Sequence, residues 1–340
     1  MALNYQRRLE NLRGRRFDPD LQKSILSESF LKAQIPEDLK YLAESMQPIE
    51  NSYNEKTIEA ANNVKNHLER GLNLTFSRDY RHQGSVMTKT NIRTHSDIDL
   101  LTVIASYWYQ QKELAESDKY KGDPKVDIEE LRRQAIQILK RIYDEVDDSG
   151  SKAITIYNKN LRRKVDIMPC YWYNLEEYEA NRDEYWRGVY LYDFNLHQRT
   201  KLDYPFAHIR SVDSKGNLTN DGSRRGVRLI KNLKVDSDEK IELSSFQLTS
   251  IVHSVENAKL YYVGGSELSI AENISFQLDK MISDPSFRKS VKSPNGTENP
   301  LTDDAIVPHC GLLKKDLDQL ILDCKSDLRN NYFEKAMKDY

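Results

Sequence analysis

The segment Gln83-Gly84-Ser85, followed by Ser96-Asp97-Ile98-Asp99-Leu100, decides the fold of this chain. Asp97 and Asp99 stand two positions apart and lead into the apolar run Leu100-Leu101-Thr102-Val103-Ile104, which is typical of a buried strand. Side chains two apart on a strand point to the same side. We therefore expect both carboxylates to face one pocket.

Two carboxylates held this close repel each other unless a cation lies between them. Oxygen-only ligands suit Mg²⁺, which takes a few carboxylates and completes its shell with water and phosphate oxygens. Gly84 allows the backbone to approach a phosphate closely, and Ser85 adds a hydroxyl and an N–H. An isolated Asp-x-Asp pair is also typical of surface turns, but with the Gly-Ser turn it indicates a site for Mg²⁺ and a nucleoside triphosphate.

A third carboxylate, Asp166, strengthens this interpretation. The segment Lys164 to Pro169 is predicted to be a strand that ends at the proline, and Ala153 to Tyr157 is its expected hairpin partner. Asp166 stands in an apolar strand, where a lone buried carboxylate would be costly. Beside the two upstream aspartates it would complete a site for two metal ions, one for the attacking hydroxyl and one for the leaving phosphate.

Composition narrows the class of protein. The chain has 340 residues, 31% of them charged, and a net charge of −2, which does not favour strong binding to nucleic acid. Its three cysteines, Cys170, Cys310 and Cys324, are too widely spaced for a disulfide framework and fit a reducing compartment. No apolar run is long enough for a membrane span. We expect a cytoplasmic protein that does not enter membranes.

The N-terminal stretch Tyr5 to Phe17 is strongly basic, with five arginines against one glutamate. Such a stretch is typical of an arm that contacts nucleic acid or an acidic partner, or of a solvated helix surface. Both interpretations are kept.

Three parts are expected along the chain: an N-terminal helical segment (1–50), a catalytic core with a long helix (51–205) and a helical lobe (206–340). Within the core we predict a helix over Ser52–Leu72, a strand near Leu74–Tyr80, a helix over Ile128–Val146 and a loop-rich stretch from Tyr171 to about Asp221.

The order Gly84-Ser85, Asp97-x-Asp99 and Asp166 resembles the DNA polymerase β-like nucleotidyltransferase superfamily. Within it, the chain resembles the bacterial cGAS/DncV-like nucleotidyltransferases, which make cyclic di- and trinucleotide signals. A second match joins Arg228–Lys234 to Leu243-Ser244-Ser245-Phe246, similar to a helix lysine and a Ser-Ser-aromatic element in cyclic GMP-AMP synthase. The resemblance implies an α+β, two-lobed nucleotidyltransferase fold with a mixed β-sheet catalytic lobe and a helical lobe around a central cleft.

The resemblance also implies roles for individual residues. Asp97, Asp99 and Asp166 are expected to be catalytic and to bind two Mg²⁺ ions, which Mn²⁺ can replace. Nucleotide contacts are expected from two groups of residues: Gln83, Gly84 and Ser85 in the first lobe, and Arg228, Lys231, Ser244, Ser245 and Phe246 in the second.

In the second group, Lys231 is expected to neutralise phosphate charge, the Ser244-Ser245 helix start to bind an anion, and Phe246 to stack on a base. The alternatives are a solvated helix lysine, a purely local helix cap and a ring packed in the core.

The implied activity is template-independent joining of ATP and other NTPs into a cyclic di- or trinucleotide second messenger. The implied role is anti-phage signalling of the CBASS type, in which the product binds a separate effector protein. Two alternative functions are also compatible with such a fold. An enzyme that adds nucleotides to RNA or tRNA is disfavoured by the near-neutral charge. A catalytically silent nucleotide-binding partner is disfavoured because it would gain nothing from three repelling carboxylates.

Overall fold

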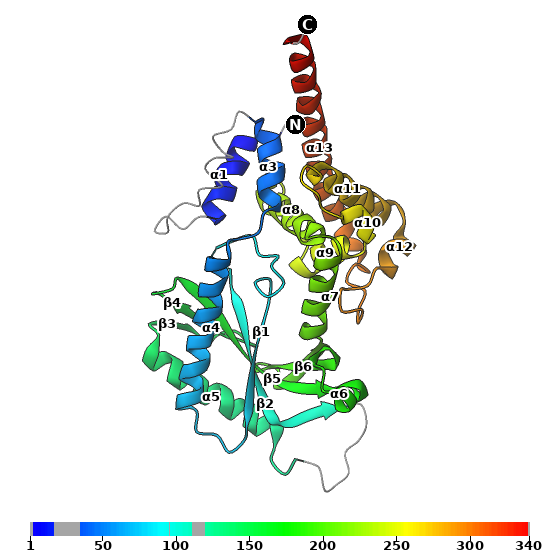
Figure 1. Cartoon of the computed structure of the whole chain (residues 1–340). Coiled ribbons are helices and arrows are strands. Elements are labelled where there is room, and N and C mark those ends of the chain that lie inside the picture. Colours follow the sequence, from blue (N-terminus) through cyan, green and yellow to red (C-terminus); the bar gives the residue numbers. More distant parts are fainter. Residues whose placement is uncertain (1–2, 17–34, 95, 111–119, 339–340) are drawn as a thin grey trace. The chain divides into compact units, whose positions relative to one another are not determined.

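The computed structural model describes residues 3–16, 35–94, 96–110 and 120–338, with side chains described as far as Asn330. The chain forms two compact units (Figure 1). The helical unit comprises Met1–Ile49, Thr90–Thr94 and Ser211–Tyr340, and the sheet unit comprises Glu50–Lys89 and His95–Arg210. The expected α+β class, with a mixed sheet and a helical part, is confirmed.

The sheet unit is built on one mixed sheet with the core strand order β1-β2-β5-β4-β3, to which β6 and β7 are added beside β5. Strands β2 and β5 run parallel, and the other pairs are antiparallel. The strands are β1 (Arg78–Gln83), β2 (Ile98–Gln110), β3 (Glu145–Asp147), β4 (Ile154–Asn158), β5 (Arg163–Asn174), β6 (Arg187–Asp193) and β7 (Gln198–Asp203).

Helices α4 (Asn51–Gly71) and α5 (Pro124–Ile142) pack on one face of this sheet. The apolar stripe of α4 meets alternate residues of β2, Ile98, Leu100 and Ile104, in one core. The intervening residues of β2, Leu101 and Val103, point to the opposite face and form a separate small core around Trp172. Short α6 (Glu176–Asn181), the 3₁₀ turn η2 (Glu184–Trp186) and the first turns of α7 (Pro205–Leu218) complete this unit.

The prediction that the third aspartate's strand ends at Pro169 is wrong, because β5 continues to Asn174. Proline cannot donate to a ladder, so it is usually excluded from central strands. Here it is tolerated because the antiparallel neighbour of β5 changes at this point. The pairing with β4 stops at Ile167 and the pairing with β6 starts at Cys170, so the missing N–H falls between two ladders.

Other predicted boundaries also move. The first strand starts at Arg78 and runs to Gln83, directly before Gly84. The helix predicted over Ile128–Val146 starts earlier, at Pro124, because the Asp123 side chain caps its N-terminus. It ends earlier as well, at Ile142. The stretch from Tyr171 to Asp221 is not loop-rich, because it holds β6, β7 and the helix α7.

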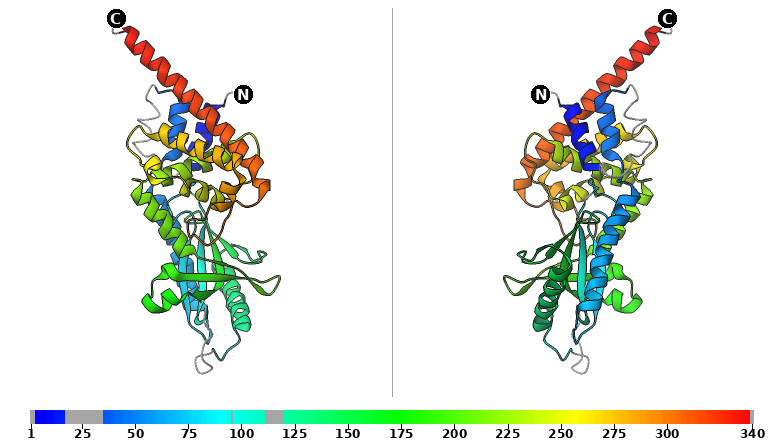
Figure 2. Two further views of the ribbon diagram at one scale, coloured as in Figure 1. Left: turned by 90° about the vertical axis from the view of Figure 1, so that its right-hand side faces the viewer. Right: turned by 90° about the vertical axis from the view of Figure 1, so that its left-hand side faces the viewer.

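The helical unit surrounds a single large apolar core. Its last helix, α13, is continuous, and its final turns extend beyond the other helices of this unit (Figure 2). No helix among the described residues combines the length and apolar character that spanning a bilayer requires. The helices are α1 (Tyr5–Arg16), α3 (Glu37–Met46), α8 (Gly222–Asp236), α9 (Ser245–His253), α10 (Asn257–Leu260), α11 (Glu267–Ser283), α12 (Pro285–Ser290), η3 (Asp304–Ile306) and α13 (Val307–Lys338).

The basic N-terminal stretch forms the helix α1, of which one face is the expected solvated surface and the other packs into the helical unit. Within α1, Arg8 is fully buried and pairs with Asp316 at 2.6 Å. Arg15 holds both carboxylate oxygens of Asp236 at 2.6 and 2.7 Å, and the buried Tyr41 hydroxyl donates to the same carboxylate at 2.9 Å. These charges therefore fasten α1 to the rest of the helical unit.

We expect Asp236→Ala to lower the free energy of unfolding by about 3–5 kcal/mol, because it removes the buried carboxylate that pairs with the mostly buried Arg15 and accepts from Tyr41. The matched control is Asp238→Ala, which removes the partner of Arg7 in a pair whose side chains are 45% and 64% exposed. That control should cost less than about 1 kcal/mol. Urea denaturation of the variants measures both values, and equal losses would contradict the assigned role.

Candidate active site

The parallel pairing of β2 with β5 brings two carboxylates side by side. Asp99 and Asp166 are direct register partners, on strands that neighbour each other at about 4.8 Å. Both alternate with residues of the α4-facing core, so both lie on the face opposite α4 and α5. Asp97 immediately precedes β2 and is exposed. The sequence prediction that these strands lie together is confirmed.

The carboxyl group of Asp99 is held in an unfavourable environment. Its pKa is raised from the ordinary 3.8 to about 6, mainly by burial and in addition by the charges of Asp166 and Asp97. A hydrogen bond from Gln83 Nε2 to Asp99 Oδ2, 3.1 Å long, acts in the opposite direction. Gln83, predicted from the sequence to contact nucleotide, is thus bound to a carboxylate of the site.

Asp166 has a partner that the sequence reasoning missed. Thr155 Oγ1 on β4 donates to Asp166 Oδ1 at 2.5 Å, and the two residues are register partners. The hairpin predicted from the sequence is present, but its turn is not the predicted Asn158-Lys159-Asn160, because Asn158 still pairs with Arg163 and residues 159–162 connect the strands. Since the turn sets the register of a hairpin, the predicted turn did not give the pairing of Thr155 with Asp166.

Gly84 follows β1 with φ of +104°, a backbone conformation that L side chains rarely adopt. A Cβ added there would lie 3.8 Å from Asp99 Oδ2. After Gly84 the chain turns tightly, with Met87 N donating to Gly84 O at 3.1 Å, and Ser85 lies in this turn. The glycine thus permits a sharp turn directly beside the carboxylate pair.

In the helical unit, Lys231 is buried on α8 and is not a solvated helix lysine. Its Nζ donates to the carbonyl oxygen of Thr90 at 3.1 Å, so it holds the segment that follows the Gly84 turn by a few residues. Its pKa is lowered to about 8, mainly by burial and in addition by the charges of Arg228 and Lys234. The ammonium group therefore remains mostly charged at pH 7.

Arg228 is also fully buried, and its guanidinium serves the fold. Its Nε donates to Met46 O, and its Nη2 donates to Asp221 Oδ2, both at 2.7 Å. Burial lowers its pKa to about 10. These contacts fasten the end of α3 and the turn before α8 to one side chain.

The start of α9 has the predicted cap. Ser244 Oγ accepts from Gln247 N at 3.1 Å, and the Gln247 side chain accepts from Ser244 N at 2.8 Å, which completes a capping box. Ser245 is exposed and Phe246 is partly buried. The exposed hydroxyl and the helix N-terminus together leave this end suited to an anion.

Within the described part of the chain, no group of three or more His, Cys, Asp and Glu side chains is gathered closely enough to hold a metal ion by itself. The donor set still fits Mg²⁺. This ion is commonly held by one or two carboxylates while water and substrate phosphates complete its shell, so an all-protein cage is not required. Burial, and after it the charges of Asp166 and Asp97, raise the pKa of Asp99, and a bound cation would favour the ionised carboxylate.

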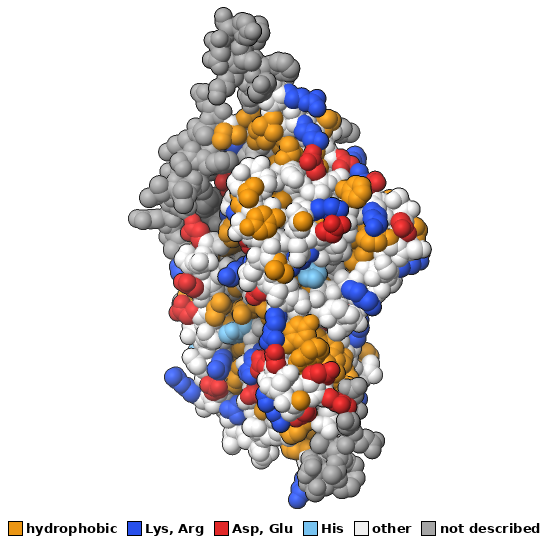
Figure 3. Space-filling model, turned by 45° about the vertical axis from the view of Figure 1, so that its right-hand side comes forward, with side chains coloured by type: hydrophobic (Ala, Val, Ile, Leu, Met, Phe, Trp, Pro, Cys, Tyr) orange, Lys and Arg blue, Asp and Glu red, His pale blue; other side chains and the backbone are white. Residues whose placement is uncertain are grey.

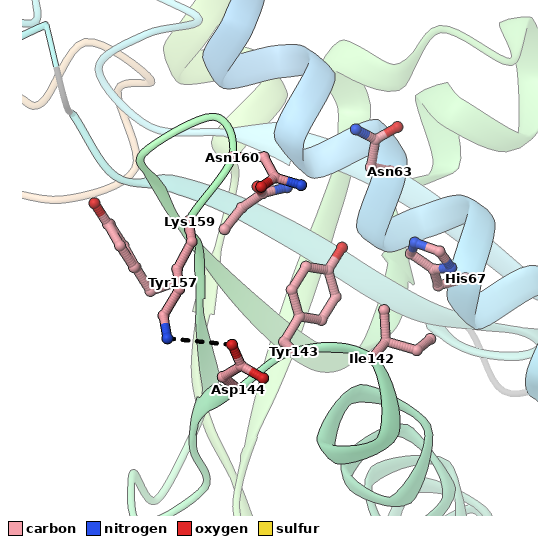
Figure 4. Close-up of a pocket in the computed structure, with 9 residues that line it drawn as sticks. Asn63, His67, Ile142, Tyr143, Asp144, Tyr157, Lys159 and Asn160 are labelled. Carbon is pink, nitrogen blue, oxygen red and sulfur yellow. Dashed lines mark hydrogen bonds and ion pairs between the residues drawn. The ribbon is translucent and has the colours of Figure 1, made fainter.

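A polar recess of about 330 Å³ lies elsewhere in the sheet unit, and the candidate active-site aspartates do not line it (Figure 4). It opens between α4, the end of α5 and the β4–β5 turn, and Lys159 pairs with Asp144 at its rim at 3.2 Å. Its lining residues are Asn63, His67, Ile142, Tyr143, Asp144, Tyr157, Asn158, Lys159 and Asn160.

Charged side chains are interspersed on the molecular face shown in Figure 3. Lysine and arginine alternate there with aspartate and glutamate, and the described residues on this face form no continuous basic track.

Comparison of the sequence with known proteins identifies related proteins over most of the chain. No protein-family model matches the sequence. A c-di-GMP synthase of Capnocytophaga granulosa is 30% identical over 321 residues, covering 87% of this chain and 90% of the relative. A c-di-GMP synthase of a Lachnospiraceae bacterium is 30% identical over 298 residues, covering 78% of this chain and 84% of that protein.

The fold agrees with these relatives. The solved structure of a STING-associated CdnE c-di-GMP synthase from Capnocytophaga granulosa superposes with a TM-score of 0.81 at 29% identity, covering 95% of this chain and 99% of the solved one. Three observations point to the same family. They are the order of the motifs, the register pairing of the carboxylates on β2 and β5, and the relatives at 30% identity over most of the chain. The chain belongs to the cGAS/DncV-like nucleotidyltransferases, enzymes that join nucleotides into cyclic second messengers.

Proposed function

We propose that this enzyme joins two molecules of GTP into a cyclic dinucleotide of the c-di-GMP class. The relatives from Capnocytophaga granulosa and from the Lachnospiraceae bacterium are both named c-di-GMP synthases, and both align over more than three quarters of this chain. The observation that carries the chemistry is the register pairing of Asp99 with Asp166 beside the Gly84 turn.

In this proposal the three carboxylates hold two divalent ions, Mg²⁺ or Mn²⁺. Asp97, Asp99 and Asp166 would hold the ions, and Asp166 would also help to remove the proton of the attacking hydroxyl. The bound ions would neutralise phosphate charge and lower the pKa of the attacking hydroxyl. In each transfer the hydroxyl oxygen forms a bond to the α-phosphorus, the bond to pyrophosphate breaks, and the hydroxyl proton leaves toward Asp166 and then solvent. Two transfers close the ring and release two pyrophosphates.

The backbone at Gly84 and Ser85 is proposed to contact the substrate phosphates beside the carboxylates. Lys231, the exposed Ser245 hydroxyl and the N-terminus of α9 with its Ser244 cap are proposed to hold the triphosphate tail. Phe246 is proposed to place its ring against a guanine base. Arg228 is proposed to support nucleotide binding through the fold of α8, since its donors are bound to Met46 O and Asp221.

The enzyme is further proposed to act in the cytoplasm in defence against phage. The related Capnocytophaga granulosa structure is described as STING-associated. By analogy, a separate effector protein of the STING type would bind the cyclic product released by this chain.

With GTP and Mg²⁺, the wild-type enzyme should give one dominant short product that resists phosphatase, since cyclisation leaves no terminal phosphate. The Asp97→Ala/Asp99→Ala double variant should give none, because it removes metal ligands without removing core packing. Chromatography of phosphatase-treated reactions, with ATP as the comparison substrate, measures both. A phosphatase-sensitive ladder of lengths would contradict cyclisation, and a dominant product from ATP alone would contradict the choice of guanine.

The metal-free protein should be stabilised by Asp99→Asn at neutral pH. Because the folded-state pKa of about 6 lies above the unfolded value near 3.8, wild-type stability falls as the pH rises between these values, and the penalty is complete above about pH 6. A shift of about two pH units corresponds to ~3 kcal/mol at most.

Urea denaturation with EDTA at pH 4 and pH 7.5 tests this expectation. Asp99→Asn should match wild type at pH 4 and exceed it at pH 7.5. In a second series, with Mn²⁺ in place of EDTA, it should lack the stabilisation that Mn²⁺ gives to wild type. Parallel pH dependences for the two proteins would contradict it.

Lys231→Ala should raise KM for GTP by about tenfold to a hundredfold with a smaller effect on kcat, since one charge-assisted contact contributes roughly 1.5–3 kcal/mol. The matched control is Lys215→Ala. Lys215 is also buried and its Nζ donates to a backbone carbonyl, that of Val255 at 2.6 Å. Steady-state kinetics should show an unchanged KM in the control. A KM that rises equally in both variants would indicate that Lys231 only supports the fold.

A further inference from the structure

One row of side chains crosses four neighbouring strands of the sheet at the same register. Gln83 on β1 pairs with Asp99 on β2, Asp99 pairs with Asp166 on β5, and Asp166 pairs with Thr155 on β4. The two acidic residues are in the middle and a neutral hydrogen-bond donor stands on each side. Each donor bonds to the carboxylate next to it.

We propose that Gln83 and Thr155 are positioning residues that hold Asp99 and Asp166 in the orientation required for metal binding. The inference rests on the proposed function of the two aspartates as metal ligands. It assigns to Gln83 a contact with the carboxylate in place of a direct contact with nucleotide, and it adds Thr155 to the residues on which the reaction depends.

The bond from Thr155 is short and comes from a stiff side chain. Its Oγ1 lies 2.5 Å from Asp166 Oδ1. A β-branched residue on a strand has few χ1 states, so the direction of the donor is well defined. The bond is made to one oxygen of the carboxylate, Oδ1.

The bond from Gln83 acts on the other carboxylate from the other side. Gln83 Nε2 lies 3.1 Å from Asp99 Oδ2 and 3.7 Å from Met168 Sδ, so the amide is anchored between β1 and β5. Gln83 directly precedes Gly84, and this anchor therefore also fixes the point at which the phosphate-facing turn begins.

Neutral donors suit this task better than cations. Two facing carboxylates repel each other and would rotate apart when no metal is bound, which would leave them poorly oriented for binding. A lysine or arginine at either end of the row would oppose this rotation but would also neutralise the charge that attracts the metal. An amide and a hydroxyl orient the oxygens while the negative charge is kept. Partners of this kind around metal ligands commonly contribute 10–100-fold to metal affinity or activity.

The test uses Thr155→Val and Gln83→Leu in the full-length protein, with Thr155→Ser as the conservative variant. Thr200→Val is the matched control, because Thr200 lies on β7 of the same sheet and its hydroxyl bonds only to the backbone oxygen of Lys201. Mn²⁺ affinity is measured on the nucleotide-free protein from the electron paramagnetic resonance signal of free Mn²⁺. Kinetics with GTP and thermal unfolding are measured in parallel.

We expect Thr155→Val and Gln83→Leu each to weaken Mn²⁺ binding and to lower kcat by about 10–100-fold. KM for GTP should change little at saturating Mn²⁺. Thr155→Ser should recover Mn²⁺ affinity, and Thr200→Val should match wild type. A loss of activity in Thr155→Val that Thr155→Ser does not recover, accompanied by a lowered melting temperature, would indicate a structural role and overturn the proposal.

The outcomes separate this inference from the proposed function. An inactive Asp166→Ala together with unchanged Thr155→Val and Gln83→Leu would overturn the positioning role alone. An Asp166→Ala that keeps full activity and Mn²⁺ affinity would overturn the proposed metal site, and the positioning role with it.

Discussion

The parallel pairing of β2 with β5 is the constraint on which the candidate active site depends. It places Asp99 directly opposite Asp166, and the same register continues outward to Gln83 and Thr155. Since side chains on a strand alternate with a period of two, a slip of one residue would turn either aspartate into the core beneath α4. The apolar residues that flank each aspartate on its own strand oppose such a slip, because they are completely buried on the other face of the sheet.

Burying the Asp99 carboxyl beside Asp97 and Asp166 lowers the stability of the sheet unit locally, and packing on both faces of the sheet offsets this cost. The pKa of Asp99 is raised to about 6 because the carboxyl is buried beside two other acidic groups. Such a cost is typical of functional sites, where groups are held ready for a ligand that is not yet bound. The surrounding sheet offsets it with fully buried side chains on both faces, including Leu100 beneath α4 and Trp172 on the opposite face.

The helical unit shows a different use of charge. Arg8, Arg15 and Arg228 are buried or nearly so, and each is paired with an aspartate of the same unit. Removing one partner of such a pair leaves a buried charge without compensation, so these contacts specify how the helices assemble. Lys231 differs from them because its ammonium group is hydrogen-bonded to a neutral residue, Thr90.

The sequence by itself determined the features that are encoded within a few neighbouring residues. The alternation Asp97-x-Asp99 before an apolar run, the hairpin of β4 and β5, and the Ser244 cap of α9 all follow from local periodicity and local hydrogen bonding.

Only the tertiary structure decided what depends on pairing between distant segments. Pro169 lies inside a strand because two antiparallel ladders meet there. Arg228 can be buried because its guanidinium donates to Met46 O and to Asp221. Thr155 reaches Asp166 because their strands are in register. Such contacts join residues whose separation along the chain carries no periodic signal, so the physical reason for each appears only when the strands and helices have packed.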